Sequence, residues 1–72
     1  MDENQIEFKL EKDFIELDNL LKAMDFAASG AEAKKIIQAG LVKVNGVAEN
    51  RVRRKLRRND NIDVKEKSVR LI

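Results

Sequence analysis

Six of the eight residues from 51 to 58 are positively charged, in a chain whose formal net charge is only +2. The six are Arg51, Arg53, Arg54, Lys55, Arg57 and Arg58. So many neighbouring cations repel one another, and contact with a polyanion relieves that repulsion. Each guanidinium can also donate two hydrogen bonds to one phosphate and displace condensed counterions. The stretch therefore points to nucleic acid; the alternative is a solvated loop that keeps a small protein in solution.

The side chains used most often in catalysis are scarce in this chain. It has no histidine, cysteine, threonine, tyrosine or tryptophan, and its hydroxyl side chains are Ser29 and Ser68. Neither serine has a histidine to act as its base, which leaves a Ser–Lys pair as the one formal alternative. The acidic residues lack the spacing of a calcium loop, and the three glycines are scattered. We therefore expect a binding domain that is not an enzyme and has no metal, cofactor or small-molecule substrate.

Composition indicates one small globular domain over residues 1–72, with residues 1–5 flexible. The chain is 43% hydrophobic and 39% charged, which is too hydrophobic for disorder throughout. Because it has no cysteine and no long apolar stretch, we expect a cytoplasmic protein without a signal peptide or a membrane contact. We also expect a monomer. Charge is uneven along the chain: residues 1–33 have a balance of −6 and residues 34–72 a balance of +8. This asymmetry predicts one anion-binding face.

The N-terminal half is predicted to form a strand and two helices. Alternating apolar residues from Ile6 to Leu10 are typical of a half-buried strand. Asp13 and Glu16 have the spacing of a capping box, which predicts a helix over residues 14–24. Ser29 and Glu32 form a second capping box, opening a helix that ends at Gly40. The apolar face of this second helix consists of Ala33, Ile36 and Ile37.

The C-terminal half is predicted to form strands. Val42 and Val44 alternate with Lys43, and Asn45-Gly46 has the sequence of a type I′ hairpin turn before a return strand at Val47. A turn at residues 60–61 separates the arginine stretch from strands over residues 62–64 and 69–72. The fold class is therefore α+β, with two short helices packed on a small, mostly antiparallel sheet.

The conformation of residues 49–58 is harder to predict. Val52 and Leu56 are four residues apart, as in a helical turn. A regular strand would place Arg54 on their side and drive it into the core. We expect an irregular, exposed excursion anchored by the two apolar residues.

The candidate nucleic-acid surface extends beyond the arginine stretch. Lys34 and Lys35 lie off the apolar face of the second helix, and Lys43 projects away from the two valines beside it. Asn45 serves the turn, while its amide is expected to be free to reach a phosphate or base. The three phenylalanines are not interleaved with the arginines, so a platform for stacked single-stranded bases is not supported. The second helix also lacks the polar residues of a DNA recognition helix, which favours folded RNA over duplex DNA.

The order of residues resembles the S-four-type RNA-binding domain, also called the αL motif. The resemblance covers residues 16–64 and is most specific in the block Gly-Leu-Val-Lys-Val-Asn-Gly at residues 40–46. It also includes Leu17-Asp18, the capping Ser29, Ala33-Lys34, Ile37 and the turn at Asp60. The resemblance implies a ribosome-associated protein that binds structured RNA, with ribosomal or transfer RNA as the expected target.

Three positions depart from the family pattern. Glu16 and Gly30 stand where the family usually has arginine, and Asn59 stands where it has glycine. The small stand-alone bacterial members of the YaaA/YbcJ type are more similar, with a Ser-Gly-Ala cap and arginines after the hairpin. In that subgroup the RNA-binding surface is expected to lie on the second helix, the hairpin and the arginine stretch. The candidate residues are Lys34, Lys35, Lys43, Asn45, Arg51, Arg53, Arg54, Lys55, Arg57 and Arg58.

Two other functions are consistent with the same residues. The basic stretch could instead dock on an acidic protein partner, in which case RNA binding would be weak and would not distinguish folded from unstructured RNA. It could also bind double-stranded DNA. The sequence does not identify the RNA or its cellular role.

Overall fold

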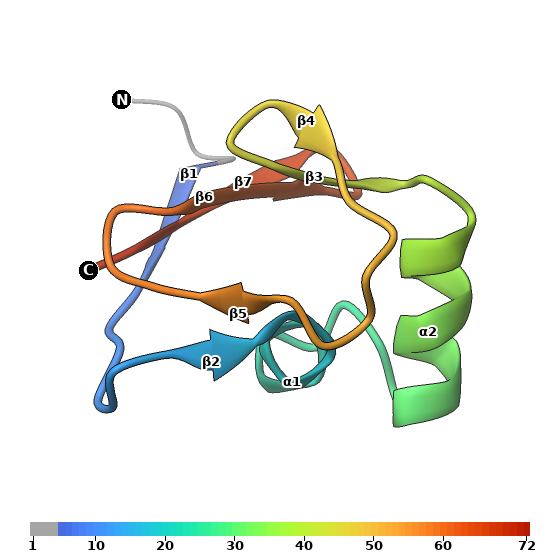
Figure 1. The fold of residues 1–72 in the computed structure, drawn as a ribbon, viewed down its shortest axis with the longest axis horizontal. Helices are drawn as coiled ribbons and strands as arrows, with labels where there is room; N and C mark the ends of the chain where they lie inside the picture. The colour runs from blue at the N-terminus through green and yellow to red at the C-terminus, as the bar shows by residue number, and fades with distance from the viewer. Residues whose placement is uncertain (1–4) are drawn as a thin grey trace.

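The structure is a computed structural model that describes residues 5–72. Two helices lie against one face of a five-stranded sheet, and a two-stranded sheet lies beside the first helix (Figure 1). The strands are β1 (Gln5–Phe8), β2 (Ile15–Glu16), β3 (Val42–Val44), β4 (Val47–Ala48), β5 (Lys55–Leu56), β6 (Asn61–Val64) and β7 (Lys67–Leu71). The helices are α1 (Leu17–Ala23) and α2 (Gly30–Gln38).

The large sheet has the strand order β1-β7-β6-β3-β4. Its first and last strands in the sequence, β1 and β7, are parallel neighbours, and the other pairs are antiparallel. The second sheet joins β2 to β5 in antiparallel register. The predicted α+β fold with a mostly antiparallel sheet is confirmed, although it contains two sheets rather than one. Residues 1–4 of the predicted flexible lead-in lie outside the described residues, and Gln5 is the first residue of β1.

The core lies between the helices and the inner face of the large sheet. The helices contribute Leu17, Leu20, Leu21, Ala33 and Ile37, and the strands contribute Val42, Val44, Ile62, Val64, Val69 and Leu71. All of these side chains are at most 3% exposed. Removing each large apolar side chain from water contributes about 1.5–3 kcal/mol. Successive side chains of a strand point to opposite faces, so the burial of Val42 and Val44 fixes which side chains of β3 face the helices and which face away.

The predicted start of the first helix is wrong. α1 begins at Leu17 and ends at Ala23, and Glu16 precedes it without a capping hydrogen bond from its side chain. Ile15 and Glu16 pair instead with Leu56 and Lys55 of β5. This tertiary pairing replaces the local capping box that the Asp13–Glu16 spacing predicts. The start of α1 is therefore decided by a segment about 40 residues further along the chain.

Carbonyl groups of the arginine stretch take the place of a side-chain cap on α1. The main-chain N–H of Leu17 donates to the carbonyl of Arg54 at 2.9 Å, and that of Asp18 donates to the carbonyl of Val52 at 3.1 Å. The first N–H groups of a helix have no acceptor within the helix, so an external acceptor stabilises its start. These two bonds tie the arginine stretch to α1.

The second helix matches its prediction. The Ser29 hydroxyl accepts from the N–H of Glu32 at 3.2 Å, as a capping serine should. The Glu32 carboxylate accepts from the N–H of Ala28 at 3.1 Å, one residue before the usual partner in a capping box. After the helix, Gly40 has a φ of +77°, which a residue without a Cβ adopts without strain.

The hairpin turn is also confirmed, whereas the later turns differ from prediction. Asn45 and Gly46 have φ values of 53° and 85°, as a type I′ turn requires. The turn predicted at residues 60–61 lies slightly earlier, because Asn59 has a φ of 78° and Asn61 already begins β6. The last strand is Lys67–Leu71, so it starts two residues before the predicted Val69.

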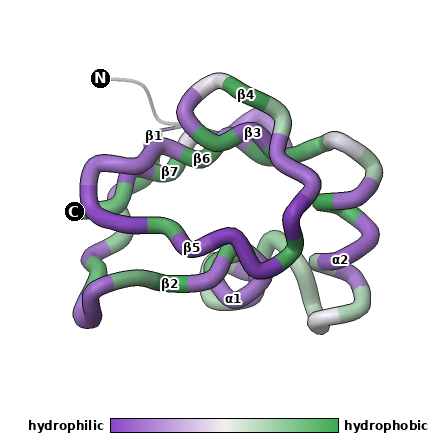
Figure 2. The backbone as a smooth tube through the Cα atoms, in the orientation of Figure 1, coloured by the Kyte–Doolittle hydropathy of each residue, from purple (hydrophilic) through white to green (hydrophobic). Residues whose placement is uncertain are grey.

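Residues 49–58 form the expected irregular excursion only in part. Leu56 is fully buried and Val52 is half-buried, so both anchor the segment as predicted. Lys55 and Leu56 nevertheless form the short strand β5. The remainder crosses the molecule between β4 and β5 as a mostly hydrophilic segment (Figure 2). Its main-chain carbonyls at Val52 and Arg54 hold it against the start of α1.

Candidate nucleic-acid interface

A buried carboxylate organises the arginine stretch. The Glu49 side chain is only 8% exposed, and its two oxygens accept from Nε and Nη2 of Arg51 at 2.9 and 3.0 Å. The same carboxylate accepts from the main-chain N–H of Arg51 at 2.9 Å and from Nη1 of Arg54 at 2.6 Å. These hydrogen bonds, led by that of the Arg51 side chain, lower the pKa of Glu49 from 4.5 to about 2, although burial acts in the opposite direction.

Two of the predicted phosphate contacts therefore already have a partner inside the protein. The Arg51 side chain is 69% exposed and that of Arg54 only 31%, so Arg51 remains the more accessible of the two. Glu49 is not among the site residues that the sequence predicts. Its position two residues before Arg51 and five before Arg54 is compatible with a local ion pair, but the spacing does not reveal that the carboxylate is buried.

Arg53 extends on the side of the helices. It lines a hollow of about 560 Å³ together with Lys22 of α1 and Lys34 of α2. Asp18, Gly30, Ala31 and Val52 complete the lining. Within residues 5–72, none of these three cationic side chains donates a hydrogen bond or forms an ion pair with another part of the protein. The hollow therefore gathers three cations and one carboxylate from three separate segments.

Two other cations of the stretch, Arg58 and Lys55, contact residues 10–14. Arg58 donates from Nη2 to the carbonyl of Leu10 at 2.7 Å. The Lys55 ammonium lies 4.9 Å from the centre of the Phe14 ring, which is a favourable cation–π position. Arg57 is exposed, and its main-chain N–H donates to Asp60 at 2.8 Å. The stretch is thus fixed at several points while the side chains of Arg53 and Arg57 project from it.

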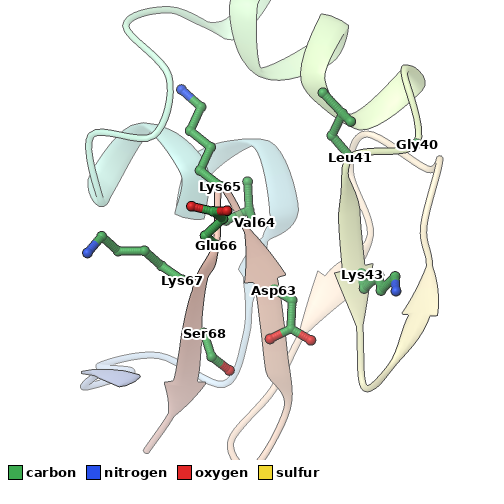
Figure 3. A pocket seen from close by; sticks show the side chains of 9 residues that line it. All are labelled: Gly40, Leu41, Lys43, Asp63, Val64, Lys65, Glu66, Lys67 and Ser68. Atoms are coloured by element: carbon green, nitrogen blue, oxygen red, sulfur yellow. The ribbon is translucent and has the colours of Figure 1, made fainter. Parts of the chain in front are cut away.

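The lysines proposed beside the arginines do not all share one surface. Lys34 joins Arg53 at the hollow, and Lys35 is exposed on the same helix. Lys43 faces away from the helices, because Val42 and Val44 on either side of it are buried. It lies at a different hollow of about 360 Å³, whose lining includes Asp63 of the neighbouring strand (Figure 3). The structure therefore separates Lys43 from the continuous positive wall that the sequence suggests.

The Asn45 amide is not free, contrary to the expectation from sequence. Its Nδ2 donates to Asp60 at 2.9 Å, and its Oδ1 accepts from the N–H of Asn61 at 2.9 Å. The main-chain N–H of Asn45 also donates to the carbonyl of Asn61 at 2.7 Å. Asn45 therefore joins the hairpin to the start of β6, in addition to its role in the turn.

The described part of the chain holds neither a cluster of metal ligands nor a helix that could span a membrane. No three histidine, cysteine, aspartate or glutamate side chains among residues 5–72 lie close enough together to hold a metal ion. Neither α1 nor α2 is long and apolar enough to cross a bilayer.

A helix pair packed on this mixed sheet, with a basic loop tied to the start of α1, has the architecture of the αL motif. The sequence model of the S4 domain matches residues 8–72, and the chain belongs to that family. The resemblance inferred from the spacing of residues 16–64 is therefore confirmed.

Two relatives place the chain within this family. It is 40% identical over 52 residues to small ribosomal subunit protein uS4 of Kosmotoga olearia, a match that covers 72% of this chain and 25% of that protein. The chain thus spans about a quarter of that relative's length. The solution structure of YbcJ from E. coli is 30% identical, with a TM-score of 0.68, over 100% of this chain and 90% of that one. That structure is described as revealing an αL motif involved in RNA-binding.

Proposed function

We propose that the protein binds structured RNA through phosphate contacts and catalyses no reaction on it. The observation that carries this proposal is the anchored arginine stretch, which brings Arg53 to the same hollow as Lys34 of α2. Membership of the S4 domain family and the RNA-binding motif described for YbcJ support it. Ribosomal or transfer RNA is the proposed target, and the match to uS4 supports the ribosomal choice.

Anchoring favours binding because fewer conformations must be lost when the RNA arrives. Glu49 and the start of α1 already hold the backbone of residues 51–54 in place. A preorganised arginine loses less conformational entropy on forming a phosphate contact than one on a mobile loop. Arg53 and Arg57 are the proposed principal contacts, with Lys34 and Lys35 at the second edge. Arg51, Arg54, Lys55 and Arg58 are placed as contacts that also hold the segment together.

The positions of the aromatic rings favour folded RNA over an extended single strand. Phe26 is buried and Phe8 is half-buried against the core. Phe14 is 37% exposed, but Lys55 lies over its ring. Because single-strand binders stack bases on exposed aromatic rings, this surface is better suited to the phosphates of a folded backbone.

The test compares the double variant Arg53→Gln/Arg57→Gln with the control Lys67→Gln/Arg70→Gln. Both double variants remove two positive charges, but Lys67 and Arg70 belong to β7 and neither lines the hollow that Arg53 shares with Lys22 and Lys34. Affinity for an RNA stem-loop is measured by fluorescence anisotropy over a range of salt concentrations. Losing two phosphate contacts should reduce the slope of log K against log salt by about 1.4–1.8 units. Arg54 is left intact because its replacement would remove one of the ion-pair partners of the buried Glu49 carboxylate.

Competition with other polymers separates the proposed function from its alternatives. We expect the stem-loop to compete better than poly(U) of equal length and better than a DNA duplex. Weak binding without preference for folded RNA would support docking on an acidic protein partner instead. Preference for the duplex would support DNA binding. Crosslinking in the native cell, followed by sequencing of the bound RNA, would then identify the target.

A further inference from the structure

Lys22 of α1 reaches the hollow from a helix that the sequence did not associate with binding. It lies in the last turn of α1, its side chain is exposed, and it lines the hollow beside Lys34 and Arg53. Its ammonium nitrogen lies 3.9 Å from the point that a Cβ would occupy at Gly30. The lysine therefore extends across from α1 to the first residue of α2.

Gly30 leaves the space into which this ammonium extends. Its backbone does not require glycine, because the glycines with positive φ among the described residues are Gly40 and Gly46. An added methyl group at position 30 would make only an ordinary contact with Lys22, at 3.9 Å. A longer side chain would compete with the ammonium for the same space. The structural consequence of glycine here is therefore room for the lysine.

The positive charges at the hollow would be neutralised by an anion from outside the protein. Several cations of the described chain are held internally: Arg51 and Arg54 by Glu49, and Lys65 by the carbonyl of Phe26 at 2.6 Å. Lys22, Lys34 and Arg53 have no such partner within residues 5–72. One carboxylate, Asp18, lies among the three, and it accepts from the N–H of Asn19 at 2.9 Å. A net positive charge remains, and a backbone phosphate would neutralise it.

We propose that Lys22 contacts an RNA phosphate at this hollow together with Lys34 and Arg53, and that Gly30 keeps the space for its side chain. The inference rests on the proposed RNA-binding function and adds to it a contact on α1.

The test is a double-mutant cycle between Lys22→Ala and Gly30→Leu, read by RNA stem-loop affinity as a function of salt. Each single variant should reduce the slope of log K against log salt by about 0.7–0.9 units, the value of one phosphate contact. The double variant should lose no more than either single variant, because both remove the same contact. Leucine is a better helix former than glycine, so thermal unfolding should show no loss of stability in Gly30→Leu.

Two controls accompany the cycle. Gly30→Ala should bind as the wild type does, since a methyl group leaves the lysine in place. Lys67→Ala removes a lysine that lines the other hollow, whose lining also includes Gly40 after the end of α2. This variant should also leave the salt slope unchanged.

The possible failures are distinguishable. No binding of the wild type to the stem-loop would overturn the proposed function itself. A wild-type slope in Lys22→Ala, while the Arg53 variant loses contacts, would overturn the role of Lys22 alone. A wild-type slope in Gly30→Leu, with a reduced slope in Lys22→Ala, would overturn the role of Gly30. Should Gly30→Leu unfold, Lys22→Ala with its Lys67→Ala control still decides the proposal.

Discussion

Replacing Glu49 by glutamine is expected to destabilise the arginine stretch at neutral pH. The carboxylate accepts four hydrogen bonds, three from Arg51 and one from Arg54. Glutamine has nearly the same shape, but it is neutral and presents an NH₂ group where one of the acceptor oxygens stands. That group would face guanidinium N–H groups, donor against donor, in a position that is only 8% exposed.

The lowered pKa of Glu49 sets the size of the effect. A shift from 4.5 to about 2 corresponds to at most about 3 kcal/mol of stability at neutral pH. The layer that covers the carboxylate is thin, because the Arg51 side chain bonded to it is 69% exposed. Water therefore screens part of the interaction, and we expect Glu49→Gln to lose about 1–2 kcal/mol.

The pH dependence separates this interaction from a general loss of packing. Because folding lowers the pKa of Glu49, its stabilisation is fully present above about pH 4.5 and is lost as the pH falls towards 2. Wild type and Glu49→Gln should therefore differ by about 1–2 kcal/mol at pH 7. By pH 3 that difference should have fallen by more than half.

The assay is urea unfolding followed by circular dichroism at pH 7, 4 and 3. Glu11→Gln is the matched control, since Glu11 is exposed and lies outside the arginine cluster. Its difference from the wild type should stay near zero at each pH. Equal stability of Glu49→Gln and wild type at pH 7, or a difference that does not shrink on acidification, would refute this account of the arginine stretch.

Two further substitutions test the supports of the candidate interface. Asn45→Ala should lose about 2–3 kcal/mol in urea unfolding, because it removes two hydrogen bonds and places alanine at a φ of 53°. Asn45→Gly should recover the backbone part of that loss and bind RNA as the wild type does; weaker binding would show that the amide contacts RNA after all. Leu56→Ala should lose about 2–5 kcal/mol, because the side chain is fully buried. The exposed Val47 provides the control, with a loss within about 0.5 kcal/mol for Val47→Ala.

The elements predicted correctly are those whose determinants lie close together in the sequence. The cap of α2 depends on Ser29 and Glu32, three residues apart, and the hairpin depends on the adjacent pair Asn45-Gly46. Local spacing failed at α1. Asp13 and Glu16 had equally good capping spacing, but Glu16 pairs with β5 as part of β2. The helix therefore starts at Leu17 without a side-chain cap. A partner about 40 residues away leaves no signal in a local pattern.

The sequence by itself determined the density of positive charge at residues 51–58, the family of the domain and the turn that precedes that stretch. Only the tertiary structure decided which cations are held inside the protein and which remain available. Glu49 holds Arg51 and Arg54, the carbonyl of Leu10 holds Arg58, and Arg53 joins Lys22 and Lys34 at one hollow. Charge is a property of each residue, whereas the burial of Glu49, the contact of Arg58 with Leu10 and the grouping at the hollow are set by how the chain packs. That packing also brings Lys22, from the acidic half of the chain, to the same hollow as the arginine stretch.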